Sequence, residues 1–210
     1  METESRAWFN PNLITRWFIV PGLIAVLALI NSILSGALSI AREREEGTFD
    51  QLLVAPYTPG EILLGKGTAS VVTGIMQAVF VVLVAMFWFR IPFQGSIWLL
   101  SAALLLFIVT AIGLCISSFA QSLQQAIVGT FLLLVPMVML SGFATPISSM
   151  PEIFQDLTLL NPMRYGLELI QRIFLEGAGF LDLWPLFAAI MAVTVAAVLA
   201  AIFSFHHKIS

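Results

Sequence analysis

The segment closest to a chemical motif is Gly60-Glu-Ile-Leu-Leu-Gly-Lys66, which has the spacing of the first part of a phosphate-binding loop. Such a loop needs Ser or Thr directly after the lysine to hold Mg²⁺, and a strand before its first glycine. Gly67 follows the lysine here, and the residues before Gly60 read as the start of a helix. We therefore expect that this chain does not bind ATP itself.

The other side chains that could do chemistry are isolated from one another. Serines in the apolar runs have no histidine near them in sequence, and His206 and His207 are adjacent in the C-terminal tail beside Lys208. Adjacent tail histidines are more often solvated than bound to a metal. The single cysteine, Cys115, resembles a small buried hydrophobic residue. The sequence thus predicts no catalytic residue, no metal site and no cofactor in this chain.

Composition places the chain in a membrane. Hydrophobic residues make up 60% of it and charged residues 10%, with a mean hydropathy of +1.01. Soluble domains contain about 45–50% apolar and about 25% charged residues. A net charge of −3 offers no basic surface to a nucleic acid. We expect an all-α, polytopic protein that contacts the lipid bilayer and no nucleic acid.

Five apolar runs have the length of transmembrane helices, about 17–25 residues. They cover residues 17–41, 68–89, 97–120, 126–143 and 184–205, and none contains a charged side chain. We expect about five spans in one transmembrane domain, residues 17–210, so that the two chain ends lie on opposite sides. The first run also carries a stripe of small residues, Ala28, Ser32 and Gly36, which suits close helix packing in lipid.

The absence of charges from these runs bears on how a transporter of this kind would be powered. Carriers coupled to protons or sodium usually place an ionisable side chain at mid-membrane to bind the ion. The polar residues that could face a pathway are few: Asn31, Thr73, Gln77, Thr110, Gln121, Gln124 and Gln125. This pattern favours an energy source outside the chain and a hydrophobic or amphipathic substrate.

The charged segment between the first two runs, Arg42–Lys66, must lie in water at one membrane face. Thr48-Phe-Asp-Gln51 matches a capping box that would start a short amphipathic helix, which Pro56 would end. Thr58 would then cap the next helix, with Pro59 at its first position. The pattern predicts an amphipathic elbow on which a soluble partner could push. An ordinary solvated loop is the alternative.

The stretch between the fourth and fifth runs is neither a plain loop nor a full span. Helix breaks at Ser141-Gly142 and Pro146 precede a restart at Ser149-Met-Pro-Glu152, and Asn161-Pro162 starts another helix. That helix has two faces: apolar Met163, Leu167, Ile170 and Phe174, and an i, i+4 ladder of Arg164, Glu168 and Arg172. We expect two short amphipathic helices at the outer surface. A plain interfacial helix with no role in gating is the alternative.

Two of these segments resemble a known family. The order Glu-Arg-Glu-x-Gly-Thr-x-Asp-x-Leu-Leu-x-x-Pro at 43–56, followed by Glu-Ile-x-x-Gly-Lys at 61–66, resembles the cytoplasmic coupling region of type-2 permeases of ATP-binding-cassette exporters. Asn161-Pro-Met-Arg-Tyr-Gly-Leu-Glu-Leu-Ile resembles the re-entrant extracytoplasmic helices of the same family. The resemblance covers nearly the whole chain.

The resemblance implies the permease subunit of a drug-efflux-like exporter in the cytoplasmic membrane of a bacterium. A separate ATPase subunit would hold ATP and Mg²⁺, and a second permease copy or homologue would complete the pore. The implied ATPase-coupling residues are Arg42, Glu43, Arg44, Glu45, Glu46, Gly47, Thr48, Gln51 and Leu52. Those implied for the re-entrant helices are Asn161, Pro162, Arg164, Tyr165 and Glu168.

The resemblance also bears on the chain ends and the orientation. Arg6-Ala-Trp-Phe-Asn-Pro11 resembles the strand that leads out of an extracytoplasmic domain in larger members, so residues 1–16 are expected to be its juxtamembrane remnant, without the first span and that domain. Lys and Arg counts in the loops nearly tie, so an outside start and a cytoplasmic elbow rest on the resemblance. A carrier or channel that does not use ATP, and a truncated structural or regulatory membrane protein, remain as alternatives.

Overall fold

The computed structural model describes residues 15–47, 59–117 and 122–209, and these residues form helices joined by short connections, without a strand among them. The long helices are α1 (Thr15–Glu45), α3 (Pro59–Phe87), α4 (Ile97–Ser117), α5 (Leu123–Met139) and α8 (Phe180–Ile209). Between α5 and α8 lie η1 (Ile147–Ser149), α6 (Glu152–Thr158), α7 (Pro162–Gln171) and the π-helix η2 (Arg172–Glu176). The predicted all-α class is confirmed.

Each predicted apolar run corresponds to one long helix. Three segments are long and apolar enough to cross a membrane, namely Trp17–Glu43, Thr68–Phe87 and Phe180–Ala200, while Ile97–Val109 and Leu123–Met139 are shorter apolar stretches. The chain is therefore a polytopic membrane protein. Several helices are longer than the predicted spans, because a helix can continue through charged residues where it lies outside the lipid.

Three helices have limits that differ from those of the apolar runs. α1 continues through Glu45 rather than ending at residue 41, and α8 begins at Phe180 rather than 184. α5 covers residues 123–139 rather than 126–143, since a side-chain cap starts it early and Gly142, with φ at +91°, follows its end. α3 begins at the predicted Pro59. Gly60–Lys66 is therefore helical, which is not the loop that phosphate binding requires.

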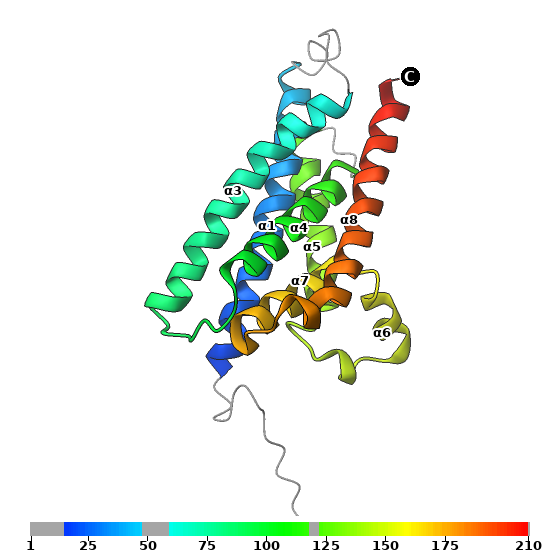
Figure 1. Ribbon diagram of the computed structural model, residues 1–210. Helices are drawn as coiled ribbons and strands as arrows, with labels where there is room; N and C mark the ends of the chain where they lie inside the picture. The colour runs from blue at the N-terminus through cyan, green and yellow to red at the C-terminus, as the bar shows by residue number, and fades with distance from the viewer. Residues whose placement is uncertain (1–14, 48–58, 118–121, 210) are drawn as a thin grey trace, which may run out of the picture.

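α1 lies at the centre of the bundle and packs against α3, α4, α5 and α7 (Figure 1). Its predicted stripe of small residues is buried, with Ala28 1% and Ser32 0% exposed. Small residues let helix backbones approach closely, and hydroxyl groups add hydrogen bonds between helices in lipid. Ser35 Oγ lies 3.2 Å from Ser70 Oγ of α3, and Gln77 Nε2 donates to the Leu27 carbonyl at 3.5 Å.

The bundle has two distinct ends. The C-terminal ends of α1 and α8 and the N-terminal ends of α3 and α5 lie at the top of Figure 1, which we call the elbow end. α6 and α7 lie at the opposite end, which we call the α7 end, together with the start of α1 (Figure 1). Among the described residues, the beginning of α1 and the end of α8 thus lie at opposite ends of the bundle.

α7 and η2 form the predicted amphipathic segment. Met163, Ile170 and Phe174 are each 0% exposed and Leu167 is 4% exposed, so the predicted apolar face is confirmed. The charged face differs from the predicted ladder. Arg172 pairs with Glu168 at 3.5 Å and with Glu176 at 3.2 Å, whereas Arg164 Nη1 donates to Thr158 Oγ1 at 2.5 Å.

The two helix starts predicted before α7 have different outcomes. Asn161 caps α7 as predicted, because its Oδ1 accepts the Met163 N–H at 3.0 Å and Pro162 takes the first helical position. The capping box predicted at Ser149 is wrong. Ser149 Oγ donates to the Pro146 carbonyl at 2.7 Å, and α6 begins after Pro151 without a side-chain cap.

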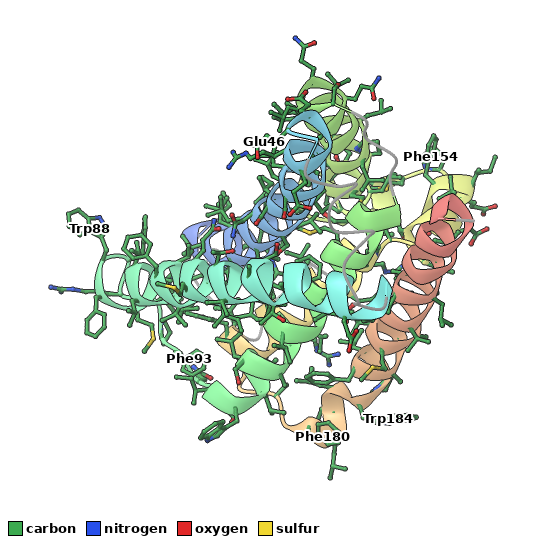
Figure 2. The ribbon with its side chains drawn as sticks, turned by 90° about the horizontal axis from the view of Figure 1, so that it is seen from above. Glu46, Trp88, Phe93, Phe154, Phe180 and Trp184 are labelled. Carbon is green, nitrogen blue, oxygen red and sulfur yellow. The ribbon has the colours of Figure 1, made fainter. Side chains whose placement is uncertain are left out.

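Exposed tryptophans surround the α7 end. Trp88 follows α3, Trp98 lies in the first turn of α4 and Trp184 in the first turns of α8, with 82%, 81% and 58% of their surface exposed. Figure 2 shows Trp88 and Trp184 pointing away from the bundle. Tryptophan is enriched where a membrane meets water, so these side chains mark one membrane interface.

The connection between α3 and α4 lies directly against the π-helix. The Gln94 N–H donates to the Phe174 carbonyl at 3.1 Å. A Cβ atom at Gly95 would lie 2.0 Å from the Ile173 carbonyl oxygen, and one at Gly177 2.8 Å from the Gln94 oxygen. The two backbones therefore approach each other as closely as only glycine permits.

We predict that Gly95→Ala lowers the stability of the protein by about 1–3 kcal/mol, because the backbone at Ile173 must move to admit the methyl group. The thermal midpoint in detergent, followed by size-exclusion fluorescence, measures this. Gly129→Ala is the matched control, since a Cβ there meets nothing within 4 Å and alanine favours the α5 helix. Equal midpoints for the two variants would contradict the contact.

Candidate functional site

The end of α1 carries the charged residues that the sequence predicted for contact with a partner. Arg42, Glu45 and Glu46 are exposed and Glu43 is half-buried. The helix ends at Glu45, the Glu46 N–H bonds to the Arg42 carbonyl at 3.0 Å, and Gly47 follows with a φ of +69°, the left-handed conformation common just after a helix. Glu46 lies at this end of the helix in Figure 2.

Part of the predicted coupling site cannot be placed. Arg44 belongs to α1, but its side chain lies outside the described residues. Thr48, Gln51 and Leu52 lie outside them as well, together with the short helix predicted over residues 48–55.

The structure brings Glu45 to the first turn of α5. Its Oε1 atom accepts the Leu123 N–H at 2.7 Å. The first four N–H groups of a helix have no partner within the helix, and the helix dipole favours a negative charge there. A carboxylate that accepts such an N–H forms one of the stronger hydrogen bonds in proteins. Glu45 thus connects the end of α1 to the beginning of α5.

A second cap completes the start of α5. Ser122 Oγ accepts the Gln125 N–H at 3.2 Å. Sequence reasoning missed this start, although Ser122-Leu-Gln-Gln125 has the spacing of a capping box and could have revealed it. No local signal could have revealed the contact with Glu45, because it joins residues 78 positions apart.

Two contacts hold α1 against its neighbours on this side of the bundle. Ser35 Oγ lies 3.2 Å from Ser70 Oγ of α3, and Glu45 accepts the Leu123 N–H of α5. α1 is thus bonded to both α3 and α5.

The residues predicted at the α7 end attach α7 to its surroundings. Asn161 uses both ends of its amide, because its Nδ2 donates to the Met137 carbonyl of α5 at 2.7 Å while its Oδ1 caps α7. Tyr165 donates its hydroxyl to the Leu159 carbonyl at 2.7 Å. Gln171 Nε2 donates to the Phe18 carbonyl at 3.3 Å. α7 is thus bonded to both α1 and α5, the same two helices that Glu45 joins at the other end.

Several characterised sequences are similar to this chain. It is 36% identical over 99% of its length to the "Probable multidrug ABC transporter permease YbhR" of Escherichia coli K12 and covers 57% of that protein. It is 38% identical over 90% of its length to the "Inner membrane transport permease YhhJ" and 33% identical over 84% to "Probable multidrug ABC transporter permease YbhS" of the same organism, covering 52% and 48% of them.

The chain thus spans about half the length of the curated relatives it matches. No solved structure matches it. The model of the ABC-2 type transporter family matches residues 5–175, which include the elbow segment and the whole of α7. With these matches and a helical bundle of membrane-spanning length, the chain belongs to the ABC-2 type transporter family.

Proposed function

We propose that this chain is the membrane-spanning part of the permease of an ATP-binding-cassette exporter in a bacterial cytoplasmic membrane. Membership of the family supports this, as do the names of the relatives, two of which are named as probable multidrug permeases. The cargo proposed is a hydrophobic or amphipathic molecule such as a drug or a lipid, since the five apolar runs carry no charged side chain that a strongly polar cargo would need.

The proposed energy source is a separate ATPase subunit that binds ATP and Mg²⁺ and docks on the elbow end in the cytosol. The exposed charges of Arg42, Glu45 and Glu46 offer a polar surface to such a partner. A second copy of this chain or a homologous permease would complete the transport pathway. A carrier or channel that works without ATP is the alternative, and the absence of an ionisable residue from the five apolar runs of the sequence disfavours it.

The bond between Glu45 and Leu123 is the observation that carries the mechanism. When the ATPase displaces the elbow, the end of α1 moves with it, and the carboxylate of Glu45 pulls on the first turn of α5. α5 is bonded to α7 through Asn161, so the displacement reaches the opposite end of the bundle. The coupling requires no movement of charge through the membrane.

We predict that the double reversal Glu45→Lys/Glu46→Lys abolishes ATP-driven transport while ATP hydrolysis by the complex continues and membrane insertion is unchanged. Lysine at position 45 repels the positive end of the α5 helix, and both changes invert the charge offered to the partner. Uptake of a fluorescent drug into inverted vesicles, measured beside phosphate release, checks this.

The matched control is Glu152→Lys/Asp156→Lys, which makes the same change in charge on exposed residues of α6 at the opposite end. It should leave both transport and hydrolysis within about twofold of the wild type, since surface charges away from an interface contribute little. Transport that survives the reversal at 45 and 46 would count against the proposed coupling site.

We predict that Glu45→Ala loosens the start of α5. The amide protons of its first turn should exchange about 2- to 30-fold faster, which corresponds to the usual contribution of a helix cap. Hydrogen-exchange mass spectrometry in nanodiscs measures this, with Glu46→Ala as a control of the same charge and Glu45→Gln as a variant that keeps an acceptor. Unchanged exchange in Glu45→Ala would remove Glu45 from the mechanism.

A further inference from the structure

A small pocket at the α7 end contains charged groups that the packing of the helices does not fully use. Its volume is about 210 Å³. It opens between α7, the beginning of α1 and the turn after α5, and its lining includes Phe18, Ser141, Arg164, Glu168 and Gln171. A wall of mixed polar and apolar side chains at this position can bind a ligand that has both a polar and an apolar part.

Arg164 and Glu168 lie one turn apart on the same face of α7. Both residues line the pocket, so it presents a positive and a negative side chain from neighbouring turns of one helix. Arg164 Nη1 is held by Thr158 Oγ1 at 2.5 Å. A guanidinium group has five N–H donors, so this bond fixes its position and leaves further donors for an anion.

The carboxylate of Glu168 is only partly neutralised. It pairs with Arg172 at 3.5 Å, and Arg172 also pairs with Glu176 at 3.2 Å. One guanidinium therefore serves two carboxylates, which leaves a net negative charge on this group of three. The Glu168 side chain is 45% exposed, so it can accept a bond from a cation in the pocket.

The neutral polar residues of the wall each bond to the backbone. Ser141 Oγ donates to the Val138 carbonyl at 2.7 Å and accepts the Phe143 N–H at 3.1 Å. Gln171 Nε2 donates to the Phe18 carbonyl at 3.3 Å. A ligand would therefore meet chiefly one cationic and one anionic side chain, which is the complement of a zwitterion.

The size and position of the pocket restrict the ligand further. Its volume equals that of about seven water molecules, below the about 300–1,000 Å³ of a site for a drug-sized molecule. Phe18 lies in the first turn of the candidate span Trp17–Glu43, and Met139, 53% exposed, ends α5 just before the pocket. The pocket thus lies where a membrane span meets water, at the level of lipid head groups.

We propose that this pocket binds the zwitterionic head group of an amphiphile, with Arg164 bonded to its phosphate or carboxylate and Glu168 to its ammonium group. The apolar part of the amphiphile lies outside the pocket against the membrane-facing side of Phe18. The head group belongs either to a phospholipid of the adjacent leaflet or to a transported amphiphile, since both present the same chemistry.

The binding test needs no ATPase partner, so its outcome is independent of the exporter assignment. The purified chain in detergent is titrated with short-chain phosphatidylethanolamine or short-chain phosphatidylglycerol, and bound lipid is counted by native mass spectrometry. We expect phosphatidylethanolamine to bind about 10-fold or more tightly, because only it offers an ammonium group to Glu168. Equal affinities for the two lipids in the wild type would overturn the proposal.

Variants test which residue causes the preference for phosphatidylethanolamine. Glu168→Gln should remove this preference, whereas Glu176→Gln should keep it, because both residues pair with Arg172 but only Glu168 lines the pocket. Arg164→Lys, which keeps the charge, should weaken the binding of both lipids by a similar factor. If folded Glu168→Gln still prefers phosphatidylethanolamine, the proposed site is wrong. If that variant does not fold, the comparison of the two lipids in the wild type tests the proposal.

The source of the head group is settled in vesicles that contain the chain with an ATPase partner and a fluorescent phosphatidylethanolamine. ATP-dependent movement of the labelled lipid to the leaflet at the α7 end, lost in Glu168→Gln, identifies a transported amphiphile. Binding without such movement identifies a resident lipid of the bilayer. Movement that Glu168→Gln leaves unchanged would exclude this pocket from the transport path.

Discussion

The packing of α1 against α3, α4, α5 and α7 is the interaction on which the rest of the structure depends. In lipid an apolar side chain gains little by leaving the acyl chains, so helices associate through close contact of small residues and through hydrogen bonds. α1 provides both with Ala28, Ser32 and Ser35. Of its span 56% is buried, against 28% for the span in α3 and 22% for that in α8.

Because α1 runs from one end of the bundle to the other, it links the elbow end to the α7 end. At the elbow end Glu45 bonds to α5, and at the α7 end the Phe18 carbonyl accepts Gln171 of α7. Asn161 makes the third contact, because it bonds α7 to α5. α1, α5 and α7 therefore form a closed ring of contacts, in which a shift of any one member changes the geometry of the other two.

The sequence predicted the features that depend on neighbouring residues. The start of α3 at Pro59, the Asn161 cap and the buried face of α7 follow from caps and from helical spacing. It could not predict which of two competing local bonds forms: Ser149 had the spacing of a cap, but the Pro146 carbonyl takes its hydroxyl. Nor could it predict the bond of Glu45, which depends on the packing of helices distant in sequence.

The tryptophans of the described helices and connections lie at one end of the molecule. Trp17, Trp88, Trp98 and Trp184 all lie toward the α7 end, and the sequence places none near the elbow end. Indole rings hold a protein at a fixed depth in the membrane. These indole rings thus place the membrane anchors of the described residues at the α7 end, so the two ends of the bundle meet the membrane through different chemistry: indole rings at one and charged side chains at the other.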